Sequence, residues 1–295
     1  MRELKRILRY IRNYMQFEMS KKEYEIDVMN TEETLYDIIN NRKSIARFGD
    51  GEFSLIFGRD LNFQKYSPEI EMKYREILKA LPEKTKYCNV AIPYVYKSLK
   101  GFNLKSKEFW TQYYRENKKA IYPLLNNEYK YADAQVTRIY INRKDKNESA
   151  KYFALWKSLW KDKDVLLVEG ELSRFGVGND LFDEVKSLKR ILCPPSNAFD
   201  YYKEIKEAIQ RHGKDKLVLL VLGPTATILA YDLAQIGYWV IDSGNLDMEY
   251  EWLNRGVSQQ TAITGKYTHE AKDGDSVEAN EDVNYVAQII EKIGV

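Results

Sequence analysis

The chain of 295 residues contains only two cysteines and two histidines. Cys88 and Cys193 lie far apart in apolar runs, without a Cys-x-x-Cys pair or a Cys/His cluster, which argues against a structural zinc site. His212 and His269 are too few for a histidine-rich catalytic metal site. Any metal must therefore be held mainly by carboxylates and substrate phosphates, which favours Mg²⁺ or Mn²⁺.

The sequence also lacks a strong charge excess and a long apolar run. The formal net charge is only +2, which argues against a nucleic-acid partner because such proteins usually carry a basic excess. No apolar stretch reaches the roughly 18 residues that a membrane span requires. The N-terminus lacks the apolar core and the cleavage site of a signal peptide. We therefore expect a cytoplasmic protein.

Residues 2–17 are predicted to form a basic amphipathic helix. Leu4, Ile7, Leu8, Ile11 and Met15 recur at helical spacing on one face. Much of the remaining surface carries Arg2, Lys5, Arg6, Arg9 and Arg12. One interpretation is peripheral contact with the inner face of the membrane. The alternative is that the apolar stripe packs on the domain or on another subunit, in a homo-oligomer or in a complex with other proteins.

From residue 31 onward, strand-like and helix-like segments alternate. The expected strands are Ser44–Phe48, Asn89–Tyr94, Thr137–Ile141, Asp164–Val168, Arg190–Cys193, Lys216–Leu222 and Gly237–Ile241. The expected helices begin at Thr31, lie within Lys105–Tyr131, begin near Asn179, cover Ala198–Arg211, run from Gly223 through Ala234, and cover Asn280–Lys292.

Apolar strands that alternate with helices predict an α/β fold, a mainly parallel Rossmann-like sheet with helices on both faces. No change in composition marks a linker, so we expect a helical extension over residues 1–30 and a single domain over residues 31–295. Right-handed crossovers bring the C-terminal ends of parallel strands to one edge, where ligands bind in open α/β sheets.

Polar residues and glycines follow most of the expected strands. They include Gly49, Asp50, Gly51, Glu52, Arg174, Gly178, Asn179, Asp180, Ser196, Asn197, Gly223, Thr225, Asn245, Asp247 and Glu249. Glycines allow backbone N–H groups to approach an anion, and carboxylates hold a cation, so this set suits a phosphate and a metal. There is no Walker A sequence, and Gly176-Val177-Gly178 lacks the third glycine of a dinucleotide site.

The most specific string is Arg47-Phe48-Gly49-Asp50-Gly51-Glu52. In an extended segment, Asp50 and Glu52 point to the same side, where both can hold a metal or one can bind a sugar hydroxyl. The alternative is a polar turn that ends a strand.

The other candidates have two interpretations each. Arg174 is a candidate clamp for a diphosphate or a partner of Glu169 or Glu171. Asn179 and Asp180 are candidates for a helix cap or for contacts with ribose and sugar hydroxyls. Gly223-Pro224-Thr225, and more weakly Ser196 and Asn197, are candidates to bind phosphate or to form a plain strand-to-helix turn. Asp247 and Glu249, two residues apart, are candidates for the general base, or they face solvent or ligate the metal.

Taken together, the motifs resemble the GT-D glycosyltransferases. The string Arg47–Glu52 resembles the opening Asp-x-Glu signature of that family. The strings Glu169–Asp180, Pro194–Phe199, Gly223–Ala226 and Ile241–Trp252 are similar to it in content and order. The resemblance covers residues 30–270 approximately.

This resemblance implies a Rossmann-like domain, a divalent metal, a UDP-sugar donor and a glycan or glycoprotein acceptor. Members of the family act in glycosylation of bacterial surface adhesins, and relatives occur among surface-polysaccharide enzymes. The resemblance also allows the protein partner to be another glycosyltransferase. By position, Asp50 and Glu52 are the Asp-x-Glu pair and the metal ligands, and Arg47, Gly49 and Gly51 belong to the donor site.

One departure concerns the last motif, where the family commonly has Gly-His and this chain has Gly244-Asn245. Asparagine can coordinate through its oxygen but cannot take up a proton near neutral pH.

The function predicted from the sequence is metal-dependent transfer of a hexose from a UDP-sugar. Two alternatives remain open at this point. One is a Rossmann-like methyltransferase with Asp50-Gly51-Glu52 or Glu169-Gly170-Glu171 near its cofactor. The other is a non-catalytic member of the family that binds a partner enzyme.

Overall fold

A computed structural model of the chain describes residues 2–21, 24–79, 85–268, 270–271, 274, 277 and 282–295. Its core is one 8-stranded parallel sheet in the order β3-β2-β1-β7-β6-β4-β5-β8. The strands are β1 (Ser44–Arg47), β2 (Cys88–Ile92), β3 (Ala132–Asp133), β4 (Asp164–Gly170), β5 (Ser187–Cys193), β6 (Leu217–Val221), β7 (Trp239–Asp242) and β8 (Ile289–Lys292). The predicted fold class is confirmed.

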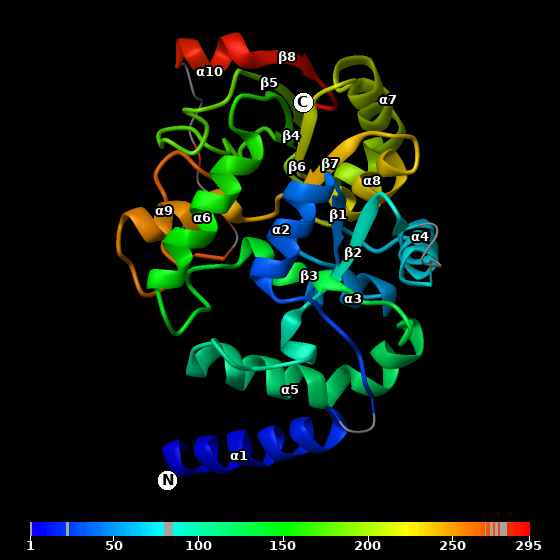
Figure 1. Cartoon of the computed structure of the whole chain (residues 1–295), viewed down its shortest axis with the longest axis vertical. Coiled ribbons are helices and arrows are strands. Elements are labelled where there is room, and N and C mark those ends of the chain that lie inside the picture. Colours follow the sequence, from blue (N-terminus) through cyan, green and yellow to red (C-terminus); the bar gives the residue numbers. More distant parts are fainter. Residues whose placement is uncertain are drawn as a thin grey trace.

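Helices cover both faces of the sheet and extend beyond its edge (Figure 1). The α-helices are α1 (Arg2–Lys21), α2 (Thr31–Asn41), α3 (Asp50–Ile56), α4 (Pro68–Leu78), α5 (Leu104–Ile121), α6 (Asn147–Trp160), α7 (Tyr202–His212), α8 (Pro224–Ala234), α9 (Leu246–Asn254) and α10 (Val283–Gln288). Short 3-10 helices are η2 (Tyr94–Tyr96), η3 (Tyr122–Leu124), η4 (Ala134–Thr137) and η5 (Ala198–Tyr201).

Successive residues of each central strand point to opposite faces of the sheet. In β4, Leu166 and Val168 belong to the apolar core that includes α4, α7 and α8, whereas Val165 and Leu167 belong to the core that includes α2, α6 and α9. Burial on both faces explains why the strands are continuously apolar in sequence.

The boundary between β1 and β7 is the thinnest part of the sheet. The ladder there pairs Ile45 with Ile241, whereas β4 and β5 pair over seven positions. The hydroxyl of Ser44 supplements this ladder, because it accepts from the backbone N–H of Val240 at 2.8 Å and donates to the carbonyl of Tyr238 at 3.2 Å. Helix α8 packs against both β1 and β7. The hydrogen bonds of Ser44 and the packing of α8 therefore supplement the single backbone pairing that joins the two parts of the sheet.

Three predicted elements differ in the structure. The predicted strand Thr137–Ile141 is absent. Thr137 ends η4, and residues 138–141 form an irregular turn in which the N–H groups of Tyr140 and Ile141 donate to the carboxylate of Glu249. No helix begins near Asn179, where the chain forms successive turns. The predicted terminal helix Asn280–Lys292 divides into α10 and the edge strand β8, and residues 280–281 lie outside the described part of the chain.

The N-terminal segment is helical as predicted. α1 lies against α5 at one end of the molecule (Figure 1). None of the helices in the described part of the chain is long and apolar enough to cross a bilayer.

Candidate active site

A cavity of about 710 Å³ opens at the C-terminal edge of the sheet. Its walls include Arg47 at the end of β1, Gly170 of β4, Pro195 after β5, Gly223 after β6 and Asp242 at the end of β7. The prediction that these loops meet at one edge is therefore confirmed. A larger surface hollow of about 1070 Å³ between α4 and α8 contains none of these strand-end residues, so it is not the candidate site.

Arg47 holds the ends of β1 and β7 together beneath the cavity. Its Nη2 bonds to Oδ1 of Asp242 at 2.6 Å, and its Nε donates to the carbonyl of the same residue at 2.8 Å. Its Nη1 donates to the hydroxyl of Thr137 at 2.7 Å and to the carbonyl of Ala134 at 3.1 Å. The guanidinium lines the cavity, but these contacts use its nitrogens to fix the framework of the site.

The contacts between Arg47 and Asp242 require a glycine at position 244. Its φ of +47° favours glycine, and a Cβ at this position would lie 2.1 Å from Nη2 of Arg47. A glycine after β7 thus allows the guanidinium to reach Asp242. Burial raises the pKa of Asp242, and the charge of Arg47 opposes this shift.

Asp50 and Glu52 begin helix α3, which corrects the extended conformation predicted for them. Phe53, Leu55 and Ile56 are buried, and this packing outweighs the low helix propensity of Gly51. Residues two apart on a helix point in different directions, so the two carboxylates do not share one side as predicted. Both nevertheless line the cavity.

The two carboxylates have different surroundings. Asp50 is exposed. Oε2 of Glu52 accepts the backbone N–H of Gly49 at 2.7 Å, as the third residue of a helix commonly does. Burial raises the pKa of Glu52 to about 7, the negative charge of Asp242 adds to the increase, and the Gly49 hydrogen bond opposes it.

A second polar wall of the cavity consists of Arg138, Asn245 and Glu270. The guanidinium of Arg138 is ion-paired with the carboxylate of Glu270, and the amide of Asn245 donates to the same carboxylate. Sequence reasoning missed two of these residues. Arg138 was hidden in the presumed strand Thr137–Ile141, and Glu270 follows a polar stretch without periodicity. Asn245, at the position where the resemblance implies a histidine, donates to an acidic side chain.

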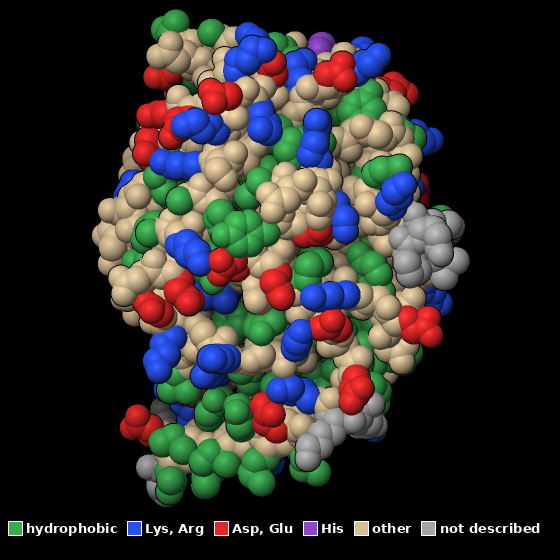
Figure 2. Space-filling view, viewed as in Figure 1, with side chains coloured by type: hydrophobic (Ala, Val, Ile, Leu, Met, Phe, Trp, Pro, Cys, Tyr) green, Lys and Arg blue, Asp and Glu red, His purple; other side chains and the backbone are tan. Residues whose placement is uncertain are grey.

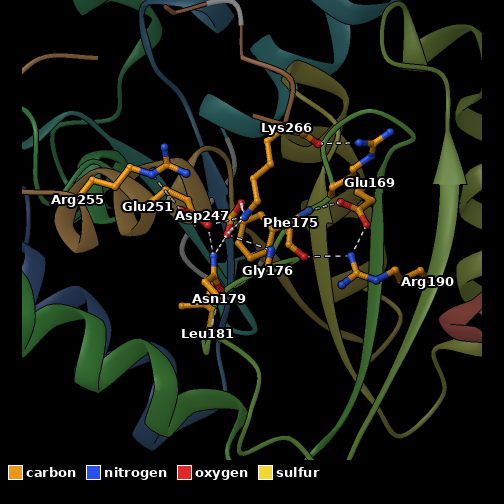
Figure 3. Close-up of polar contacts among 12 residues, drawn as sticks. Glu169, Phe175, Gly176, Asn179, Leu181, Arg190, Asp247, Glu251, Arg255 and Lys266 are labelled. Carbon is orange, nitrogen blue, oxygen red and sulfur yellow. Dashed lines mark hydrogen bonds and ion pairs between the residues drawn. The ribbon is translucent and has the colours of Figure 1, made fainter. Parts of the chain in front are cut away.

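Two other predicted site residues, Asp247 and Asn179, belong to a largely buried network of polar contacts (Figure 3). Asp247 pairs with Nζ of Lys266 at 2.7 Å. Its Oδ1 accepts the backbone N–H of Gly176 at 3.0 Å and the amide of Asn179 at 2.8 Å. Asn179 also donates to Glu251 at 2.7 Å. Asp247 and Asn179 therefore bind each other and the framework, and neither lines the cavity.

A second buried ion pair continues this network (Figure 3). Oε2 of Glu169 accepts the backbone N–H of Phe175 at 2.7 Å, and its other oxygen pairs with Arg190. Nη1 of Arg190 also donates to the carbonyl of Phe175 at 3.0 Å. These contacts order the turns between β4 and β5, where a helix was predicted. The string Glu169–Asp180 thus builds a loop that replaces a crossover helix.

Three further candidates, Arg174, Glu249 and Asp180, also lie outside the lining of the cavity. Nη1 of Arg174 donates to the carbonyl of Gly265 at 2.8 Å. Glu249 is buried against the turn at residues 140–141, and burial raises its pKa. Asp180 bonds to the hydroxyl of Tyr250 at 2.6 Å and to Lys157 at 2.7 Å.

Two candidates after β5 and β6 support the neighbouring segment 61–65. Asn197 donates its N–H to the carbonyl of Phe63 at 2.8 Å and accepts the N–H of Lys65 at 2.8 Å. Thr225 is buried, with its hydroxyl 3.4 Å from Oε1 of Gln64. Gly178 has a φ of +77° in the loop after β4. By contrast, Ser196, Gly223, Gly49, Gly51 and Asn245 line the cavity.

The donor atoms at the cavity suit a cation that also binds ligand phosphates. Among the described residues, no group of three or more His, Cys, Asp and Glu side chains could enclose a metal, and His269 lies outside them. Asp50 and Glu52 provide oxygen ligands at the cavity, and Mg²⁺ commonly binds one or two carboxylates together with substrate phosphates. The residues therefore fit an ion shared with a phosphorylated ligand.

The sheet and its cavity define an α/β protein with a ligand site at the ends of parallel strands. Residues 45–271 match the family model described as glycosyltransferase GT-D fold. The chain therefore belongs to the GT-D glycosyltransferase family.

Two curated relatives have similar sequences. The probable glycosyl transferase Gly of Streptococcus gordonii is 37% identical over 269 residues, which cover 91% of this chain and 39% of the relative. The glycosyltransferase GlyD of Streptococcus pneumoniae is 36% identical over 268 residues, which cover 91% of this chain and 33% of the relative. The chain thus spans well under half the length of these two proteins.

Solved structures agree with the fold. A structure described as domain of unknown function 1792 with a distinct glycosyltransferase fold has a TM-score of 0.88 and 35% identity, covering 96% of this chain and 100% of that one. A glycosyltransferase of the same domain family from Streptococcus sanguinis has a TM-score of 0.86 and 36% identity, covering 91% of this chain and 100% of that one. This likeness agrees with membership of a glycosyltransferase family and not with the methyltransferase alternative.

Proposed function

We propose that the protein is a metal-dependent glycosyltransferase that moves a hexose from a UDP-sugar to a glycan or glycoprotein acceptor. The observation that carries this proposal is the cavity, where Asp50 and Glu52 lie with Gly223 at the start of α8. The cavity places carboxylates, which can hold a cation, beside a helix N-terminus, which can bind a diphosphate.

The N-terminus of α8 is the proposed anchor for the diphosphate. Gly223 precedes the helix with a φ of +53°, and Pro224 occupies its first turn. The first N–H groups of a helix have no partner within it and carry partial positive charge, so they attract anions. Ser196 and Asn245 add polar side chains to the same cavity.

Asp50 and Glu52 are the proposed ligands of Mg²⁺ or Mn²⁺ together with the donor phosphates. The ion would neutralise the negative charge that develops on the leaving diphosphate. The helical start of α3 keeps the two carboxylates on the cavity wall by anchoring Phe53, Leu55 and Ile56 in the core.

For a direct transfer, the acceptor oxygen forms a bond to the anomeric carbon while the bond from that carbon to the diphosphate breaks. The hydroxyl proton must pass to a base in the cavity. The contacts of Asp247 and Glu249 direct both side chains into the framework. We therefore assign the role of general base to a carboxylate that lines the cavity, and not to Asp247 or Glu249.

We expect UDP to bind only in the presence of the divalent cation. Calorimetric titration of UDP with Mn²⁺ should give a dissociation constant at least about tenfold lower than the same titration in EDTA, because the ion screens the diphosphate from Asp50 and Glu52. Uridine, which lacks phosphates, serves as the matched ligand and should show no dependence on Mn²⁺. UDP affinity that does not change in EDTA would contradict the metal assignment.

Two further measurements address the alternatives. Binding of S-adenosylmethionine in place of UDP would support a methyltransferase. Mass spectrometry of a mixture of nucleotide-sugars incubated with the protein identifies the donor from its hydrolysis products. Absence of both hydrolysis and transfer for every donor, with UDP binding retained, would support a non-catalytic family member.

A further inference from the structure

Helix α1 contacts the rest of the protein through its more polar side. Asn13, Phe17 and Ser20 are buried. The ring of Phe17 meets the ring of Tyr114 in α5 edge to face, with centroids 4.9 Å apart. Nη2 of Arg6 bonds to Oε2 of Glu108 in α5 at 2.9 Å. These contacts fix the orientation of α1 about its own axis.

The apolar face of α1 consequently points away from the protein. Its side chains are exposed at fractions of 61% for Leu4, 57% for Leu8, 47% for Ile11, 59% for Met15 and 71% for Met19. Figure 2 shows the hydrophobic side chains gathered along the outer edge of the molecule over this helix. An apolar stripe normally packs inward, so this orientation needs an external partner to cover it.

Basic side chains flank this outer face. Lys5, Arg9 and Arg12 are exposed, and no acidic side chain in the described part of the chain forms an ion pair with any of them. At 100° per residue they lie on the flank between the outer face and the side that contacts α5. Glu3 and Glu18 are the acidic residues of the helix, which are outnumbered by its lysines and arginines, so the helix has a net positive charge.

We propose that the outer face of α1 binds the surface of an anionic lipid bilayer. Helices that lie in a membrane interface combine an apolar face, which enters the acyl boundary, with basic residues that meet the anionic headgroups. A 20-residue helix is about 30 Å long, and its full length is presented at one end of the molecule (Figure 1). The body of the protein lies behind it and leaves the stripe accessible.

A second copy of this chain fits the same face less well. Contact between two α1 stripes would bring Lys5, Arg9 and Arg12 of each copy toward the same boundary, and like charges there are repulsive. One helix face is also a narrow strip, whereas stable interfaces bury about 800 Å² on each partner. The charge pattern therefore favours lipid over self-association.

The cavity lies close to this surface. Lys105 and Phe109 of α5 line the cavity and also a groove between α5 and α1, whose other side includes Arg9. The proposed membrane contact would hold the cavity about one helix layer, on the order of 10 Å, from the lipid. This inference concerns location and does not depend on the reaction catalysed.

The test uses the full chain and vesicles of either phosphatidylglycerol or phosphatidylcholine, with binding followed by co-sedimentation at low salt. We expect binding to phosphatidylglycerol vesicles and much weaker binding to phosphatidylcholine. The variant Leu8→Ser/Ile11→Ser/Met15→Ser should lower the apparent affinity at least about tenfold, because three apolar side chains no longer enter the lipid. Circular dichroism and the melting temperature verify that the variant folds.

The matched control is Met72→Ser/Ile236→Ser/Val286→Ser, which removes three side chains with exposed fractions of 53%, 51% and 51% at other places on the surface. It should bind vesicles as the unaltered chain does. Equal loss of binding in both variants would overturn the proposal, because it would show that general surface hydrophobicity carries the interaction.

A charge variant provides an independent arm. Lys5→Gln/Arg9→Gln/Arg12→Gln should weaken binding to phosphatidylglycerol and reduce its sensitivity to salt. The matched control replaces with glutamine three exposed lysines of other elements, Lys189 in β5, Lys203 in α7 and Lys214 after α7, and should retain binding.

Two results would overturn the membrane assignment. One is failure of the full chain to bind phosphatidylglycerol vesicles at low salt. The other is a dimer in sedimentation equilibrium that the apolar variant dissociates, without vesicle binding by either protein, which would identify a second copy as the partner.

Discussion

The variant Glu52→Gln is expected to be more stable than the unaltered protein above neutral pH and to lose most of its transfer activity. Glutamine keeps the size of the side chain and can still accept the N–H of Gly49, since either residue serves at this helix position. The variant therefore removes the charge and preserves the start of α3.

The sign of the stability effect follows from the raised pKa. In the absence of metal, Glu52 has a pKa of about 7 in the folded protein and an ordinary value of 4.5. Between these values the folded state binds more protons than the unfolded state, so the free energy of unfolding falls as the pH rises. We expect this residue to account for a decrease on the order of 2 kcal/mol between pH 5 and pH 8, with allowance for partial solvent exposure.

Urea unfolding in EDTA at several pH values measures this effect. Glu33→Gln is the matched control, because Glu33 is also the third residue of a helix and its carboxylate accepts the N–H of Asn30 at 2.8 Å, but it is exposed. The control should keep the pH dependence of the unaltered protein. An identical pH dependence in Glu52→Gln would show that Glu52 is not the titrating group.

Activity of the same variant tests the proposed function separately. We expect kcat to fall at least about a hundredfold with UDP-sugar and Mn²⁺, because loss of one metal ligand weakens the stabilisation of the leaving diphosphate. A stable Glu52→Gln enzyme with full activity would eliminate Glu52 from the metal site.

The second large effect is expected for Gly244→Ala. The new methyl group would lie 2.1 Å from Nη2 of Arg47 and would displace the guanidinium from Asp242. Disruption of a largely buried ion pair costs about 3–5 kcal/mol because an unpaired charge remains. Chemical denaturation should therefore show a severe loss of stability, and the cavity floor should lose its order.

Gly256→Ala is the control that measures the cost of a left-handed backbone conformation alone, without a steric clash of the kind expected at Gly244. Gly256 has a φ of +62°, but a Cβ there meets no atom within 4 Å. This control should cost only about 1 kcal/mol. In an Arg47→Ala background the steric conflict is absent, so Gly244→Ala should then cost no more than Gly256→Ala. An equally large cost in both backgrounds would show that Arg47 is not the reason for the glycine.

The sequence was sufficient to predict the parallel sheet because its central strands are buried on both faces and apolar throughout. It also predicted that the loops after β1, β4, β5, β6 and β7 converge, since parallel topology dictates this. It could not predict the conformation of Asp50–Glu52, because the glycines suggest a turn and the helix depends on burial of the following residues. Helix propensity is a weak guide where tertiary packing decides.

Individual side chains were harder to place than elements. Asn179 and Asp180 have two candidate roles in the sequence, a helix cap or contacts with ribose and sugar hydroxyls. In the structure Asn179 accepts the N–H of Leu181 at 3.1 Å but also donates to the distant Asp247, and Asp180 accepts the hydroxyl of Tyr250. The run Thr137–Ile141 has the composition of a strand, yet Glu249, more than 100 residues away, takes its backbone N–H groups. Such long-range pairings leave no periodic signal in the sequence.

The single pairing between β1 and β7 gives the proposed ligand a second role, because its binding would help to hold the two parts of the sheet together. The cavity contains groups from both sides of this seam, including Gly49 and Asp50 after β1, and Gly223 and Asn245 on the far side. Transient parting of the sheet along the seam would pull these groups away from one another. A diphosphate bound as proposed, in contact with both sides, would hold the two parts of the sheet together, and its binding free energy would add to the stability of the folded state.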